Sequence, residues 1–181
     1  MQDIRESLER VRERIARAAE RAGRRPEDVL LVGVSKTVDV ERIRQALFDV
    51  IHSLDRLELA HELDRRARAA GRVVDALLQV NVGGEAQKGG FPPDAVDAAL
   101  GAVAALGGIR VRGLMTIPPA VGRAEDTRGW FQALARVGKR HGLPELSMGM
   151  SADFEVAVEE GATMGRVGTA IFGARPPKGT G

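Results

Sequence analysis

The sequence predicts an α/β protein built on a parallel sheet. Six short apolar runs recur along the chain, and amphipathic helical segments separate them. Parallel neighbours need a crossover connection long enough to hold a helix, so this alternation is typical of βαβ units. The chain contains no repeat, low-complexity tract or linker, which indicates one domain over residues 1–175 followed by a disordered tail at 176–181.

The chain opens with an amphipathic helix. Its apolar residues recur at steps of three and four and form one stripe, which consists of Ile4, Leu8, Val11, Ile15, Ala18 and Ala22. Gly23 and Pro26 end this helix. Eight arginines in residues 5–25 alternate with acidic residues. This pattern favours a solvated surface with ion pairs one turn apart over the alternative of a binding surface.

The remaining elements alternate. We expect strands at residues 29–36, 48–55, 75–82, 110–117, 145–150 and within 164–173. We expect the intervening helices at residues 40–47, 55–71 and 93–106, around Trp130, Phe131, Leu134 and Val137, and at 152–160. Asp39, Asp55 and Ser151 are the expected N-caps, because short polar side chains accept hydrogen bonds from the first turn of a helix. A glycine-rich loop follows the third strand.

Parallel α/β folds place their working groups at the carboxyl ends of the strands. The residues expected at those ends are Ser35, Lys36, Ser53, Asp55, Asn81, Met115, Thr116, Met150, Ser151, Gly168 and Thr169. His52 alternates with Ser53 along its strand, so we expect its side chain to point to the opposite face, away from this site.

Lys36 is the most informative of these residues. The chain contains only four lysines, and Lys36 alone follows a buried apolar run; the others are Lys88, Lys139 and Lys178. A partly desolvated amine has a lowered pKa and attacks carbonyl carbons, which arginine cannot do. The alternative is a lysine that reaches out of the strand end to meet a carboxylate.

The run 166–173 is the second candidate. A strand that runs into Gly168 and Thr169 and then a short helix offers backbone N–H groups and a hydroxyl, the elements of a phosphate site. Ser151 would add another hydroxyl. A tight turn is the alternative explanation for this pattern alone. Together with Lys36, it predicts a carbonyl-reactive amine and a phosphate site at one edge of the sheet.

Several segments resemble the pyridoxal phosphate homeostasis family, whose fold is like the N-terminal barrel domain of alanine racemase. They are VSKT around Lys36, IHSLDR, QVNVGGEAQKGG, VRGLMTIPP and LSMGMSADFEVAVEEGATMGRVGTAIFGAR. The resemblance implies a TIM-type (β/α)8 barrel that holds pyridoxal 5′-phosphate (PLP) as a Schiff base on Lys36. It also implies that Arg166 faces the pyridine nitrogen and that Ser151, Gly168 and Thr169 hold the phosphate. Further implied cofactor contacts are Asn81, Met115 and Met150.

The chain also departs from this family. Between Leu47 and Val50 the family carries two further strand units, with a Gly-Glu-Asn segment and a His-x-Ile-Gly-x-Leu-Gln segment, and neither occurs here. Strands two and three of the barrel are therefore expected to be absent. Either the sequence omits a stretch that the molecule contains, which we favour because a barrel that loses adjacent strands exposes two edges, or the chain is a shortened variant. We expect an open sheet or a break between Leu47 and Phe48.

The family resemblance and the residue types together favour cofactor binding with little or no turnover. An arginine beside the pyridine nitrogen keeps that nitrogen unprotonated and weakens the ring as an electron sink. The chain has no tyrosine to serve as a second base opposite the lysine, as alanine racemase requires. The expected function is intracellular PLP homeostasis. A PLP-dependent racemase-like enzyme and a Schiff-base aldolase for phosphorylated sugars remain as alternatives.

The amino-acid composition limits the classes of ligand and partner that we expect. The 27 basic and 25 acidic side chains leave a net charge of +2, which favours neither nucleic acid nor acidic membranes. No apolar run approaches the roughly 20 residues of a spanning helix, and the charged opening residues lack a signal-peptide core, so we expect a cytoplasmic protein. The absence of cysteine excludes disulfides and thiolate zinc sites. We expect a monomer without metal, with PLP as ligand and PLP-dependent apoenzymes as candidate recipients.

Overall fold

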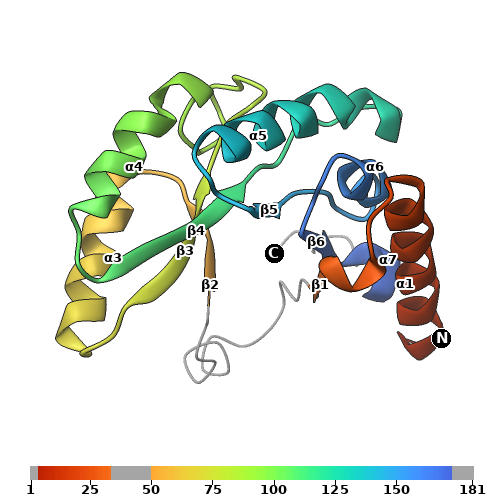
Figure 1. The fold of residues 1–181 in the computed structure, drawn as a ribbon, viewed down its shortest axis with the longest axis horizontal. Helices are drawn as coiled ribbons and strands as arrows, with labels where there is room; N and C mark the ends of the chain where they lie inside the picture. The colour runs from red at the N-terminus through yellow and green to blue at the C-terminus, as the bar shows by residue number, and fades with distance from the viewer. Residues whose placement is uncertain (1–3, 34–49, 173–181) are drawn as a thin grey trace, which may run out of the picture.

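The computed structural model describes residues 4–33 and 50–172, and it confirms the α/β class. Six strands form one curled sheet in the order β1-β6-β5-β4-β3-β2, and all five neighbouring pairs are parallel (Figure 1). The strands are β1 (Leu30–Gly33), β2 (Val50–Leu54), β3 (Val74–Gln79), β4 (Ile109–Met115), β5 (Glu145–Ser147) and β6 (Met164–Val167).

Helices connect the strands as the sequence predicts. The α-helices are α1 (Ile4–Arg21), α3 (Leu57–Ala69), α4 (Val96–Ala104), α5 (Arg128–Arg140), α6 (Phe154–Glu159) and α7 (Thr169–Phe172). Single 3-10 turns are η1 (Pro26–Asp28), η2 (Pro93–Ala95) and η3 (Ala124–Thr127). The helix expected at residues 40–47 and its cap Asp39 lie outside the described residues.

Two of the expected N-caps are wrong. Helix α3 begins after Arg56, and the Asp55 carboxylate pairs with the Arg56 guanidinium at 2.7 Å instead of capping the helix. Helix α6 begins after Asp153, because a turn separates it from Ser151. The Ser151 hydroxyl is therefore free to bond elsewhere.

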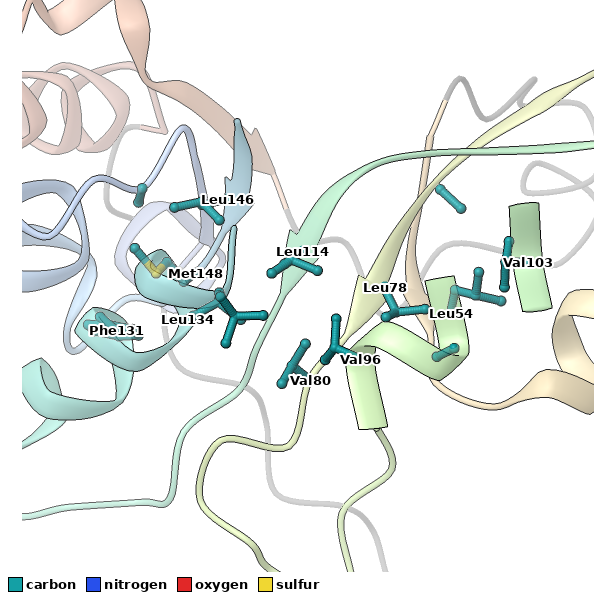
Figure 2. Packing of buried hydrophobic residues seen from close by; sticks show 14 of the residues in the cluster. Leu54, Leu78, Val80, Val96, Val103, Leu114, Phe131, Leu134, Leu146 and Met148 are labelled. Carbon is teal, nitrogen blue, oxygen red and sulfur yellow. The ribbon is translucent and has the colours of Figure 1, made fainter. Parts of the chain in front are cut away.

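The helices cover one face of the sheet, which we call the outer face. Side chains from β2, β3, β4 and β5 pack there against α3, α4 and α5 in one continuous hydrophobic cluster (Figure 2). Fully buried members on the strands include Leu54, Leu78 and Leu114, and the helices contribute Val96 and Phe131. A second outer cluster joins α1 and α6 to Val167 of β6.

The opposite face, which we call the inner face, carries side chains that alternate with the outer ones. Leu77, Met115 and Met164 form a small buried cluster on this face, with Val32 and Val50 packed against it. Leu77 precedes outer Leu78, and Met115 follows outer Leu114, as the two-residue period of a strand requires. The inner face is the part of the sheet that an eight-stranded barrel encloses.

The sheet formed by the described strands is open, and an open sheet was one of the two outcomes expected from the sequence. Strands β1 and β2 lie at its two edges, and no pairing joins them among the described residues. In an eight-stranded barrel the strands missing from this order would stand between β1 and β2. The Leu47–Phe48 junction, where a break was the alternative, lies outside residues 4–33 and 50–172.

Candidate functional site

Arg166 is the centre of the polar groups on the inner face. Register places it on β6 beside Val32 of β1, and its backbone N–H donates to the Gly149 carbonyl. Its guanidinium donates to the Ser147 hydroxyl at 2.6 Å and to the Thr116 carbonyl at 2.8 Å. These two bonds tie the end of β6 to β5 and to the end of β4, so the arginine is held on two sides.

The Arg166 side chain is partly buried and forms no salt bridge with a carboxylate in the described part of the chain. Desolvation lowers the pKa of Arg166 to about 10, and the charge of Asp153 opposes this shift. The guanidinium therefore stays protonated near neutral pH. A fixed, desolvated cation interacts strongly with a polar ligand that enters the inner face.

His52 also lies on the inner face, so the expectation that it points away from the site is wrong. Its Nδ1 lies 3.0 Å from the Ser147 hydroxyl, across β3 and β4, while Ser53 is exposed. The register of β2 against β3 shifts between Ile51 and Leu54, so simple alternation fails at this point. Ser147, which the sequence reading did not single out, joins His52 to Arg166.

The groups expected to hold a phosphate come together beyond the end of β6. The Ser151 hydroxyl accepts hydrogen bonds from the backbone N–H of Gly168 at 3.3 Å and of Ala170 at 3.2 Å. Thr169, between them, begins α7 and is exposed. Two backbone N–H groups and the Ser151 hydroxyl thus lie together beyond the end of β6, and this donor set suits an anion.

The turn that carries Ser151 is rigidly built. Gly149 has φ +86°, and a Cβ there would lie 2.6 Å from the Cβ of Ala157, so only glycine fits. The Asp153 carboxylate accepts the Met150 N–H at 2.7 Å. Burial raises the pKa of Asp153, although this hydrogen bond and the charge of Arg166 oppose the shift. We therefore assign Asp153 a structural role in this turn and not a direct contact with a ligand.

The other expected site residues divide into two groups. Met115 lies in the inner-face cluster beside the polar groups. The Met150 side chain is exposed, and its backbone N–H donates to the Asp153 carboxylate in the turn that carries Ser151. The side-chain amide of Asn81 is engaged within its own loop, where it bonds the backbone of Glu85 and Lys88. Lys36, the expected covalent attachment point, lies outside the described residues, three positions beyond the end of β1.

The glycine-rich loop after β3 is tied to the body of the protein. Lys88 donates to the Pro118 carbonyl at 2.8 Å and pairs with Glu85, and the Phe91 N–H donates to the Gln79 carbonyl. These bonds hold the loop against neighbouring segments and therefore support a structural role for it, in preference to a role as a mobile gate over the site.

Neither a metal site nor a membrane helix occurs in the part of the chain that the structure describes. No group of three or more metal-ligating side chains comes together in residues 4–33 and 50–172. None of the helices described there is long and apolar enough to cross a membrane.

Comparisons with known proteins agree with this geometry. The alanine racemase N-terminal domain family matches residues 7–176. The pyridoxal phosphate homeostasis protein of Aquifex aeolicus is 39% identical, with 94% of this chain and 97% of the relative covered. The protein of the same name from Pseudomonas aeruginosa is 34% identical, with 97% of each chain covered.

Solved structures share the fold. A protein of unknown function from Bifidobacterium adolescentis has a TM-score of 0.83 at 30% identity, and the match covers 93% of this chain and 94% of that one. PipY of Synechococcus elongatus PCC7942, solved with PLP bound, has a TM-score of 0.66 at 30% identity, and the match covers 88% of this chain and 100% of PipY.

The alignment with the Aquifex relative also contains a large gap. It spans 222 positions, whereas 94% of 181 residues is about 170, so about 50 positions of the relative have no counterpart in this chain. A deficit of this size agrees with the loss of two βα units, since a whole βαβ unit takes about 30 residues or more. The open edges at β1 and β2 are the structural counterpart of that deficit.

Proposed function

The chain belongs to the alanine racemase N-terminal domain family, and we propose that it binds pyridoxal 5′-phosphate and acts in PLP homeostasis. The observation that carries the proposal is the donor set at Ser151, Gly168 and Ala170, which lies just beyond the partly buried cation Arg166 on β6. A phosphate ester on a planar aromatic ring fits such an arrangement. PipY, solved with PLP, supports the proposal through its similarity to this chain.

Each part of the site has a task in this proposal. Ser151, Gly168 and Thr169 hold the phosphate, and Arg166 faces the ring nitrogen. Met115 contributes to the apolar floor under the ring, whereas Met150 and Asn81 are outer contacts. Lys36 would hold the cofactor covalently through its amine, and the aldehyde of the cofactor would supply the carbonyl for this attachment.

We further propose that the protein carries the cofactor with little or no turnover. Arg166 remains protonated near neutral pH and therefore cannot protonate the ring nitrogen as a carboxylic acid would. The relatives from Aquifex and Pseudomonas carry homeostasis names, which supports this choice. The protein would then act as a cytoplasmic monomer that releases PLP to PLP-dependent apoenzymes.

The attachment experiment uses the purified chain with added PLP. We expect a yellow absorption band that borohydride abolishes, with the reduced cofactor covalently fixed on the peptide that contains Lys36. The Lys36→Ala variant should give no reducible adduct. Lys139→Ala is the matched control, because Lys139 lies in the last turn of α5, and it should behave as the unaltered chain does.

Two outcomes would overturn this function. One is the absence of the absorption band in the unaltered chain at saturating PLP. The other is a reducible adduct that persists in Lys36→Ala. A colourless protein that borohydride traps only with a phosphorylated sugar would favour the Schiff-base aldolase instead.

A racemase-like activity is the second candidate, because the structure places the His52 imidazole on the inner face. Burial and the charge of Arg166 lower the pKa of His52, so the ring is neutral and able to accept a proton near pH 7. This activity predicts exchange of the α-hydrogen of an added amino acid with deuterium from solvent. No exchange over a panel of amino acids would remove this candidate.

A further inference from the structure

Three residues from three strands form a continuous polar chain across the inner face. Arg166 on β6 donates to Ser147 on β5, and the Ser147 hydroxyl lies 3.0 Å from the Nδ1 of His52 on β2. His52 and Ser147 are 95 positions apart in the sequence. The surrounding inner-face side chains Leu77 and Met115 are apolar, so this chain is the main polar connection there.

The donor inventory fixes one of the two hydrogen bonds: a guanidinium only donates, so Ser147 accepts from Arg166. Between Ser147 and His52 the roles follow the tautomer of the ring. In the neutral tautomer with its proton on Nε2, Nδ1 accepts the Ser147 proton. A hydroxyl that accepts from a cation is a better donor, so the two bonds strengthen each other in this tautomer. The order of donation is then Arg166 to Ser147 to His52.

We propose that His52 is a positioning residue of the cofactor site, which acts through Ser147 to fix the guanidinium of Arg166. This inference rests on the proposed PLP binding. The Thr116 carbonyl holds one nitrogen of the guanidinium, and Ser147 holds another. Without His52, the Ser147 hydroxyl can rotate toward other acceptors, and only the carbonyl contact of Arg166 keeps a fixed direction.

The arrangement makes the site sensitive to acid. The charges that act on His52 in the described residues are Arg166 on β6, which lowers its pKa, and Glu145 on β5, which raises it; burial has the largest effect and lowers it. A proton on Nδ1 removes the acceptor for Ser147 and places a second cation beside Arg166. Protonation of His52 should therefore loosen the hold on the ring nitrogen.

The first experiment measures PLP affinity by absorption in four variants: His52→Ala, His52→Asn, Ser147→Ala and the double variant Ser147→Ala with His52→Ala. His52→Ala removes the acceptor, whereas His52→Asn keeps an oxygen close to the position of Nδ1. We expect His52→Ala to weaken PLP binding about threefold to tenfold, the effect of one hydrogen bond, and His52→Asn to restore most of it. In the Ser147→Ala background, His52→Ala should have little further effect, because the connection is already broken.

The second experiment needs no cofactor. Proton NMR of the free chain follows the three histidines, with exposed His61 as the internal reference. Ser147→Ala should raise the pKa of His52, because the hydroxyl no longer stabilises the neutral ring. Unfolding would also raise the pKa of His52, since burial is what lowers it most. The variant must therefore show the circular dichroism spectrum and the urea midpoint of a folded chain over the titrated range.

The outcomes separate this inference from the proposed function. If the unaltered chain binds no PLP, the function fails. If it binds PLP, and His52→Ala binds equally well or His52→Asn is as weak as His52→Ala, the positioning role is overturned while the function stands. An unchanged His52 pKa in Ser147→Ala would overturn it as well.

Discussion

The outer face of the sheet buries eighteen hydrophobic residues in its main cluster, whereas the inner face buries three in the described part of the chain. The outer face is sealed by α3, α4 and α5 (Figure 2). The inner face also carries a partly buried arginine and histidine, which both contact a buried serine. Burial of apolar area stabilises the fold, but desolvated polar groups give a site its chemistry.

This division explains why the described part of the candidate site keeps its contacts although the sheet is open. The absent strands would stand between β1 and β2, next to neither β4 nor β5. The proposed phosphate site at the end of β6 and the Ser147–Arg166 contact both lie in the described part of the sheet. Loss of a βα unit at an edge removes its own contacts and leaves the register of the remaining pairs unchanged.

Leucines 77 and 78 offer the sharpest test of the two faces, because both are fully buried neighbours on β3. Leu78→Ala leaves a cavity in the sealed outer cluster and should lower the free energy of unfolding by about 3–5 kcal/mol. Leu77→Ala should cost about 2 kcal/mol, because its cluster is smaller. Urea unfolding followed by circular dichroism measures both changes.

PLP affinity should show the opposite order. Leu78→Ala should bind PLP normally while it is folded, whereas Leu77→Ala should bind it more weakly. Equal losses of stability and of affinity in the two variants would mean that the faces do not differ in role.

The fold was predictable because its outer face follows simple periodicity. Apolar runs separated by amphipathic helices gave the correct class and the correct number of strands in the described residues. The caps at Asp55 and Ser151 failed because capping depends on where each carboxylate or hydroxyl finds its partner, and these partners come from outside the local pattern. Asp55 pairs with Arg56, and Ser151 meets the end of β6.

The next largest effect is expected at Ser151. Ser151→Ala removes one hydroxyl from the donor set beyond β6 and should weaken PLP binding about tenfold or more, since a hydrogen bond to a charged group contributes about 1.5–3 kcal/mol net. Binding of pyridoxal, which lacks the phosphate, should hardly change. Ser53→Ala is the control, because Ser53 is an exposed serine on β2. Equal losses for PLP and pyridoxal would argue against a phosphate contact.

The candidate site was only partly predictable from the sequence. Strand-end position pointed to Ser151 and Gly168, which the structure brings together. His52 and Ser147 were missed because their meeting depends on sheet curvature and on the register shift in β2, neither of which alternation reveals. Ser147 itself was the signal that the sequence offered, because a buried serine among apolar strand residues needs a hydrogen-bond partner.

The pH dependence of stability distinguishes the faces without any ligand. Burial and Arg166 lower the pKa of His52 in the folded chain, while the unfolded chain titrates near 6.5. Between the two values the unfolded state binds more protons, so stability rises with pH and is lost as pH falls from about 6.5 toward the folded value. Urea midpoints over this range should vary less in His52→Asn. An identical profile in both chains would contradict this linkage.

The smallest effect on stability is expected at the surface ion pairs that join α1 to α6. These pairs belong neither to the outer cluster around Leu78 nor to the inner cluster around Leu77. Arg21 pairs with Glu159 at 2.7 Å, but Arg128 also holds Glu159 and Glu160, so the carboxylates keep a partner when Arg21 is removed. Exposed pairs of this kind contribute little because water and salt screen them. Arg21→Ala should therefore leave the melting temperature unchanged within error at moderate salt. A clear drop in calorimetry would mean that α1 depends on this ion pair and not on the Val11 and Ile15 cluster that packs it against α6.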